Sequence, residues 1–216
     1  MIQNELQVHD IPWKNCLALG SDNAPVMVGK DRGVFGFVIK EQPNLYLSGS
    51  VCHLIHIAAV KGSACRPLNV DQLLIDVYYY LDESSKWQAV FKDMQILHDT
   101  KATKILKRVS VRWLSINMCL QRLLDNWDPL HEVFKEQEKS ASSRSLKERV
   151  NKLRLTFSSP TNRLVCLFLV DALNLLDDVN TKLQCNAPLI HVLKRHLEKL
   201  LKTILLKFMK PSTILY

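Results

Sequence analysis

Asp22 is the residue whose type and position most clearly offer chemistry. The run Cys16–Leu19 has the pattern of a buried strand and leads directly into "GSDN" (20–23). Strand ends in α/β sheets hold carboxylates on rigid backbone, where they bind metal or substrate. Asp and Asn also favour the positions where a helix begins. Asp22 is therefore either a catalytic carboxylate or a local cap of a following helix, and this pattern leaves both open.

The stretch "VCHLIH" (51–56) brings together three side chains that bind soft metal ions. His53 and His56 are three residues apart, so on a helix both imidazoles share one face, with Cys52 beside them. Such ligands are typical of zinc sites, which need a fourth ligand when they are structural. Cys65 is the only further cysteine nearby, and the spacing fits no standard zinc finger. We therefore favour a helix start with polar contacts and predict no metal site.

The stretch "KILKRVSVRWLS" (104–115) combines basic side chains with an indole. Lys104, Lys107 and Arg108 precede Arg112 and Trp113, a combination that suits contacts to phosphates and stacking on bases. In the alternative interpretation, Trp113 anchors a helix start and the planar guanidinium of Arg112 holds a carboxylate.

Other catalytic motifs are missing from the sequence. "GKDRG" (29–33) lacks the glycine spacing of a phosphate-binding loop, and there is no Gly-x-Ser-x-Gly elbow. A hydrolase triad cannot be assembled from the pattern, so we expect no small-molecule substrate.

The elements that would position Asp22 form a predicted βαβ unit. Asn15–Gly20 and Leu45–Val51 are predicted strands, and Asp31–Lys40 is a predicted helix between them. Two strands joined by a helix are expected to pair in parallel. Parallel sheets are normally buried and several strands wide, so the strands that should flank this pair are missing from the pattern.

The remainder of the chain has helical periodicity. Asn69 is a predicted N-cap, Pro129 suits a first helical turn, and "SASSRS" (140–145) is a predicted exposed loop. The predicted helices begin at Cys52 and include Asn69–Leu81, Ser84–Leu97, Trp113–Asn126, a continuation from Pro129, Leu146–Phe157, Thr161–Leu183 and Pro188–Met209.

The segment Pro188–Met209 has the cleanest period. Its basic residues lie mostly opposite one apolar stripe. The stripe consists of Leu189, Val192, Leu193, Leu197, Leu200, Leu201, Ile204, Leu205 and Phe208. A membrane-surface or partner helix has this pattern, but we favour the core face of a helical bundle.

Composition is that of an ordinary globular chain, with 47% hydrophobic and 23% charged residues among 216. No apolar run reaches the length of a membrane span and no signal peptide is predicted. Six cysteines without paired spacing suit reduced thiols in the nucleus or cytoplasm.

Residues 1–100 carry 8 Lys and Arg against 11 Asp and Glu, whereas residues 101–216 carry 21 against 10, giving net charges of −3 and +11. Such asymmetry indicates either a surface that faces nucleic acid or solvated helix faces.

Four stretches occur here in the order found in one family. "SDNAPVMVGK" (21–30), "VCHLIHIAA" (51–59), "VSVRWLSINMCLQRLLDNW" (109–127) and "NRLVCLFLVDALNLLDDVNTKLQCNAPLIHVLKRHLEKLL" (162–201) resemble the transposase domain of the hAT superfamily and its domesticated derivatives. The resemblance covers about residues 13–210. It implies a ribonuclease-H-like fold interrupted by a large all-helical insertion.

The resemblance also implies roles for the residues introduced above. Asp22 matches the second acid of an Asp-Asp-Glu triad that holds divalent ions, Mg²⁺ or Mn²⁺, for DNA strand transfer. Cys52 and His56 match the family's Cys-His motif, although three residues separate them here instead of two, with His53 among them. Arg112 and Trp113 match the Arg-Trp motif near the start of the insertion.

Departures from the family pattern decide the functional expectation. Asp10, in "VHDIPW", is the one Asp before Asp22 and is poorly placed for a central strand, and the catalytic Glu of the family lies beyond the insertion. The family's upstream zinc finger and downstream dimerisation segment have no counterpart here. We therefore expect an internal piece or domesticated remnant without enzymatic activity, because one carboxylate cannot hold and space two metal ions.

These considerations predict a mainly α fold with a small parallel β remnant. Residues 1–62 are the expected partial ribonuclease-H-like segment, and residues 63–216 are the expected helical insertion region. The expected role is nuclear nucleic-acid binding through Lys104, Lys107 and Arg108, with no cofactor and no membrane partner. A helical protein-interaction module, in the nucleus or cytoplasm, is the alternative, and an active transposase is a third.

Overall fold

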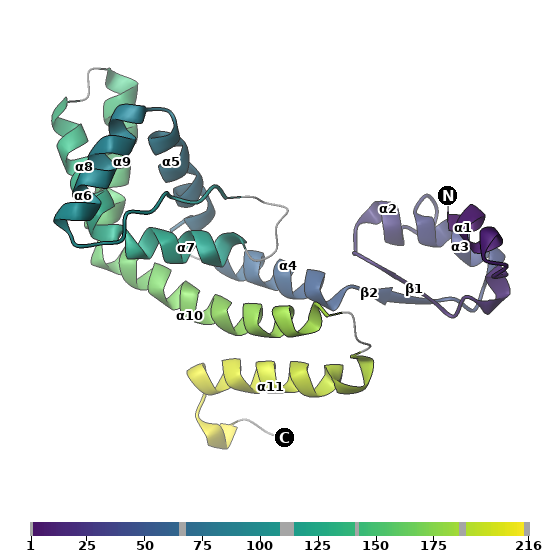
Figure 1. Cartoon of the computed structure of the whole chain (residues 1–216). Helices are drawn as coiled ribbons and strands as arrows, with labels where there is room; N and C mark the ends of the chain where they lie inside the picture. The colour runs from purple at the N-terminus through teal and green to yellow at the C-terminus, as the bar shows by residue number, and fades with distance from the viewer. Residues whose placement is uncertain (1, 65–67, 109–114, 141–142, 186–188, 214–216) are drawn as a thin grey trace. The chain divides into compact units, whose positions relative to one another are not determined.

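The computed structural model describes residues 2–64, 68–108, 115–140, 143–185 and 189–213. It is mainly helical, with two short strands (Figure 1). The chain divides into two compact units, Met1–Ala58 and Ala59–Tyr216. The division falls within helix α4 (Val51–Ala64).

The first unit contains the predicted parallel pair of strands. β1 (Ala18–Ser21) and β2 (Tyr46–Gly49) pair in parallel, with Ala18 opposite Tyr46 and Ser21 opposite Gly49. The strand prediction is confirmed, although both strands are shorter than the apolar runs suggested. A one-turn 3₁₀ helix, Trp13–Asn15, and helix α1 (Ile2–Val8) precede β1.

The connection between the strands contains helices α2 (Pro25–Val28) and α3 (Val34–Glu41). The predicted helix over Asp31–Lys40 thus begins three residues late, because Gly33 is extended and its N–H donates to the Gly29 carbonyl at 3.0 Å. Backbone packs on backbone here: a Cβ on Gly33 or Gly36 would overlap main-chain atoms of residues 29 and 30. The glycines of "GKDRG" therefore permit a tight turn between two helices.

Helices joined by turns and loops make up the second unit, with no strand among its described residues. Asn69 caps its first complete helix by accepting from Gln72 N at 3.0 Å, as predicted, and Ser143 and Ser159 cap two later ones in the same way. The helices after α4 are α5 (Val70–Asp82), α6 (Ser85–Leu97), α7 (Ser115–Asp125), α8 (Trp127–Ser140), α9 (Arg144–Ser158), α10 (Pro160–Leu183) and α11 (Ile190–Phe208).

The core of this unit lies among α5 to α10. Leu74, Leu120, Leu130 and Phe134 are fully buried in it. The Trp127 indole packs on another ring of the core and donates from Nε1 to the Phe157 carbonyl at 3.1 Å. This polar contact satisfies the indole N–H, so the large side chain can be buried without a desolvation penalty.

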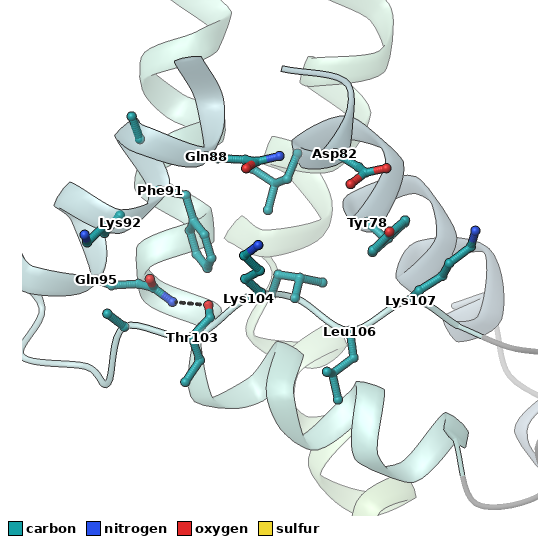
Figure 2. A pocket seen from close by; sticks show the side chains of 14 residues that line it. Tyr78, Asp82, Gln88, Phe91, Lys92, Gln95, Thr103, Lys104, Leu106 and Lys107 are labelled. Atoms are coloured by element: carbon teal, nitrogen blue, oxygen red, sulfur yellow. Dashed lines mark hydrogen bonds between the residues drawn. The ribbon is translucent and has the colours of Figure 1, made fainter. Parts of the chain in front are cut away.

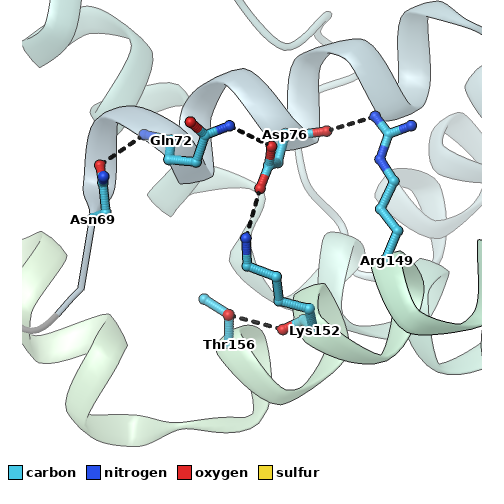
Figure 3. A network of polar contacts seen from close by, with 6 residues as sticks. All are labelled: Asn69, Gln72, Asp76, Arg149, Lys152 and Thr156. Atoms are coloured by element: carbon cyan, nitrogen blue, oxygen red, sulfur yellow. Dashed lines mark hydrogen bonds and ion pairs between the residues drawn. The ribbon is translucent and has the colours of Figure 1, made fainter. Parts of the chain in front are cut away.

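Asp76 ties α5 to α9 at the edge of this core (Figure 3). Its carboxylate accepts from Gln72 Nε2 at 2.7 Å and pairs with Lys152 Nζ at 3.2 Å. Its main-chain carbonyl accepts from Arg149 at 3.5 Å. Basic residues of α9 are therefore used to hold the bundle together.

Helix α11 differs from the prediction. It packs on α10, and Lys207 pairs with Asp171 across the two helices. None of the described side chains of α11 is buried, and Leu201 is 59% exposed. The prediction of a core helix is therefore wrong: α11 is an outer helix, partly covered by α10. Within the described ranges, no helix has the length and apolar character needed to cross a membrane.

Candidate nucleic-acid interface

Asp22 lies immediately after β1 and is exposed. Its Oδ1 accepts from Ala24 N at 3.3 Å, a local contact just before α2. This contact between residues two apart is a local turn: Ala24 is the N-cap of α2, and no side chain caps that helix, so Asp22 does not have the capping role that the sequence left as the alternative to catalysis. Since the strands are parallel, Asp22 and the start of α4 lie at the same end of the sheet.

The Cys52–His56 stretch forms the first turns of α4. Ser50 Oγ accepts from His53 N at 3.2 Å, as at a helix N-terminus. Burial raises the pKa of the Cys52 thiol, which favours the protonated form over the thiolate that binds metal. Within the described residues, no three His, Cys, Asp or Glu side chains gather as metal ligands. Cys65, Arg112 and Trp113 lie outside the described residues.

The basic stretch after α6 has no helix or strand from Thr100 to Arg108. The chain leaves α6 through Asp99, whose φ of 50° lies in the left-handed region. Thr100 N then donates to the Gln95 carbonyl at 2.8 Å. Side chains of neighbouring helices hold the segment at two carbonyls: Gln95 Nε2 donates to Thr103 O at 2.9 Å, and Arg122 donates to Lys104 O at 3.3 Å.

Arg108 fixes the other end of this segment. Its Nε lies 2.6 Å from Asp71 Oδ1, and its Nη1 donates to Ser115 Oγ at 2.9 Å. The Arg108 side chain is only 5% exposed. Of the three residues expected to contact nucleic acid, Arg108 is therefore occupied within the protein, whereas Lys104 and Lys107 are exposed.

Residues 102–107, α5 and α6 enclose a pocket of about 700 Å³, which we call the basic groove. Figure 2 shows the segment passing below α6 and α5, with Lys104 near the centre and Lys107 beside Tyr78. Tyr78, Leu81 and Asp82 line it from α5, and Phe91, Lys92 and Gln95 line it from α6.

The groove carries three lysines and one carboxylate. Lys92, Lys104 and Lys107 form no ion pair with any described residue, and Asp82 is the acid among the lining residues. Lys107 Nζ lies 5.9 Å and 5.7 Å from the ring centroids of Tyr78 and Tyr79, within the range of cation–π contacts. The rings thus hold an ammonium group at the mouth of the groove.

Cations on α9 behave differently, because acids neutralise most of them. Arg149 pairs with Glu83 at 2.9 Å, and Arg154 pairs with Glu138 at 2.9 Å. Lys152 pairs with Asp76 in the network of Figure 3. Cations without an acidic partner are therefore more available to an external anion at the groove than along α9.

The segment also offers main-chain donors. The backbone N–H groups of residues 102–107 donate no hydrogen bond to any described residue. Unpaired N–H groups beside lysines are suited to anionic oxygen atoms.

Sequence reasoning found Lys104 and Lys107 but missed Lys92, Asp82 and Gln95. These three lie on helices whose approach to the segment depends on tertiary packing, and no local pattern distinguishes them. Comparison of the chain with protein-family models, with curated proteins and with solved structures finds no match in any of the three.

Proposed function

We propose that the chain is a non-catalytic, nucleic-acid-binding derivative of a hAT-type transposase, acting in the nucleus, and that the basic groove is its binding site. The four motif stretches support the derivation. In this proposal the β1–β2 pair is a remnant of a ribonuclease-H-like sheet, and the second unit is the helical insertion.

The observation that carries the binding role is the set of three unneutralised lysines around one groove. Lys92, Lys104 and Lys107 come from two elements and converge on the same pocket. Lysines that contact phosphates release condensed counterions, which supplies most of the affinity in non-specific binding. Tyr78 adds an aromatic surface of the kind on which bases stack.

The non-catalytic part of the proposal is supported within the described residues, where no group of three His, Cys, Asp or Glu side chains includes Asp22. Its carboxylate makes a local contact to Ala24 N. We expect no Mg²⁺- or Mn²⁺-dependent cleavage of DNA by the chain. Cleavage that is lost in Asp22→Ala would contradict this part of the proposal.

Fluorescence anisotropy with labelled oligonucleotides of about 16 nucleotides tests the binding role. The chain should bind at about 50 mM salt and bind much more weakly at about 200 mM salt. Lys104→Glu with Lys107→Glu should lower the affinity at low salt. Loss of two phosphate contacts should also reduce the slope of log K against log salt by about 1.4 on a single strand.

A matched control distinguishes binding at the groove from attraction by the overall net charge. Lys139 and Lys147 are exposed, and neither forms an ion pair with a described residue. Their double change to Glu alters the net charge by the same amount and should leave affinity close to wild type. Equal losses from the two pairs would mean that overall charge, and no particular groove, attracts the nucleic acid.

Protein binding is the second candidate function, favoured by exposed apolar residues on the last two helices. Leu164 and Leu167 on α10 are 65% and 48% exposed, and Leu201 and Leu206 on α11 are 59% and 44% exposed. If the folded chain binds no oligonucleotide at low salt, protein binding becomes the favoured function.

A further inference from the structure

A hydrogen-bond acceptor on a nearly buried side chain lies in the wall of the basic groove. The Gln95 side chain is 2% exposed and lines the groove. Its Nε2 donates to Thr103 O at 2.9 Å and to Asn126 Oδ1 at 2.5 Å. Figure 2 shows the amide nitrogen turned to Thr103, with the amide oxygen on the other side.

Neighbouring contacts fix the orientation of this amide. Asn126 is 1% exposed, and its Nδ2 donates to the Arg122 carbonyl at 2.8 Å, so its Oδ1 must face Gln95 as an acceptor. Gln95 must then present Nε2 to Asn126, and a flip of the amide would lose two hydrogen bonds. Gln95 Oε1 is left as an acceptor without a hydrogen-bond donor among the described residues.

Gln95 Oε1 is not among the fully buried polar atoms without a partner, so water in the groove can reach it. A ligand that covers the groove displaces this water and costs free energy unless it donates a hydrogen bond in its place. The walls beside it are apolar, since Phe91 is 5% and Ile105 is 8% exposed. The three lysines lie around the same pocket. A ligand that fits these features has a flat apolar body, a donor on its edge and an attached anion.

We propose that the groove binds one unpaired base of a single strand, whose Watson–Crick edge donates to Gln95 Oε1 while flanking phosphates contact the lysines. The inference rests on the proposed function and adds the substrate class. Each natural base has a donor on that edge, and base pairing in a duplex occupies it. The groove should therefore require a single strand without requiring a particular base.

Single-strand preference distinguishes this mode from attraction to phosphates. Counterion release per phosphate is larger for duplex DNA than for single strands, so purely electrostatic binding favours the duplex. At equal salt, we expect the full-length chain to bind a single strand about tenfold more tightly than a duplex of the same length, as measured by anisotropy.

Changes in the oligonucleotide test the donor without altering the protein. An oligomer whose bases are all unsubstituted purine lacks the amino group of adenine. An oligomer of N3-methylthymine lacks the N3–H of thymine. Each should bind about tenfold more weakly than its parent strand, because in the complex Gln95 Oε1 would be covered without a donor. Equal affinity of the parent and donor-deleted strands would overturn the inference and leave the proposed function standing.

A groove-filling variant tests the location. Ala89 lines the groove on the exposed surface of α6, so Ala89→Trp should remove the preference for single strands and for the base donor. Ile96→Trp is the control, because Ile96 is on the same helix, is 65% exposed and does not line the groove. A single-strand preference that survives Ala89→Trp would overturn the inference. Absence of binding to every oligonucleotide would overturn both it and the proposed function.

Discussion

Lys107 and Arg108 are neighbours in the chain, yet their side chains have different partners. Lys107 is exposed over two tyrosine rings, whereas the guanidinium of Arg108 pairs with Asp71 and Ser115. A planar guanidinium can bridge two elements through several donors, which a lysine cannot do. Arg108 is therefore a residue of the fold, and its replacement should act on stability before it acts on binding.

Arg108→Met tests this role while keeping most of the side-chain length. It should lower the free energy of unfolding by about 2 kcal/mol, since hydrogen bonds to charged groups are lost at a side chain that is nearly buried. Lys101→Met, at an exposed position of the same segment, should change it by less than about 0.5 kcal/mol. Urea denaturation measures both, and equal values would contradict the structural role of Arg108.

Tyr80 links side-chain burial to a pH dependence of stability. Its hydroxyl donates to Gln137 Oε1 at 2.8 Å, and its side chain is 3% exposed. Burial raises the pKa of Tyr80 to about 12, although the Arg149 guanidinium, centred 5.5 Å from the ring centroid, opposes the shift. The folded state therefore holds this proton more tightly than the unfolded state, and the associated stability is lost as pH rises from about 10 to about 12.

Tyr80→Phe should remove this contribution. The variant should be less stable than wild type at neutral pH by about 1 kcal/mol, because Gln137 Oε1 loses its donor. As pH rises from about 10 to about 12, the stability difference between the two proteins should shrink. Denaturation at several pH values checks the trend, and a constant difference would refute the assigned cause.

At the scale of elements, the turn between α2 and α3 depends on the absence of side chains. Gly33 and Gly36 have negative φ angles, which any residue can adopt. Glycine is needed at both positions because main-chain atoms of residues 29 and 30 lie where a Cβ would be. The opposite case is Gly62 in α4, where a Cβ would meet open space. In a helix interior, Gly costs up to about 1 kcal/mol relative to Ala.

Two alanine substitutions should consequently change stability in opposite directions. Gly36→Ala should destabilise the first unit, because the new Cβ collides with the Lys30 carbonyl oxygen. Gly62→Ala should stabilise α4 by about 0.5–1 kcal/mol. Hydrogen exchange of residues 29–49 and of α4 reports each effect separately, and protection of residues 29–49 that is unchanged in Gly36→Ala would contradict the packing argument.

Elements with a local cause could be predicted from the sequence. Asn69 was identified as a cap because its side chain needs only Gln72 N, three residues away, and strand spacing predicted the parallel pair. The partial covering of α11 could not be predicted, because an apolar stripe looks the same whether one helix or several cover it. What covers a stripe is a property of tertiary packing.

At the scale of the whole molecule, charge is distributed unequally between the two units. Residues 1–58 carry 4 Lys and Arg against 5 Asp and Glu, and residues 59–216 carry 25 against 16, which gives −1 and +9. Ion pairs such as Arg163–Asp128 neutralise part of the second total. The cations of the basic groove are among those left over, which makes the second unit the part that should attract nucleic acid.

The groove itself could be predicted only in part. Lys104 and Lys107 were visible as a basic stretch, but the Arg108–Asp71 contact joins residues 37 apart, and the Gln95–Asn126 contact joins residues 31 apart. Such pairings follow from how helices pack, and no local pattern encodes them. The sequence therefore predicted a basic segment and could not predict which of its cations are free.

Hydrogen exchange of residues 102–107 tests the central claim most directly. Their backbone N–H groups have no hydrogen-bond partner among the described residues, so they should exchange rapidly in the free chain. A single-stranded oligonucleotide at saturating concentration and low salt should slow exchange in this segment, while exchange in α11 stays unchanged. Unchanged exchange of residues 102–107, when anisotropy shows that the chain is bound, would contradict the assignment of the groove as the binding site.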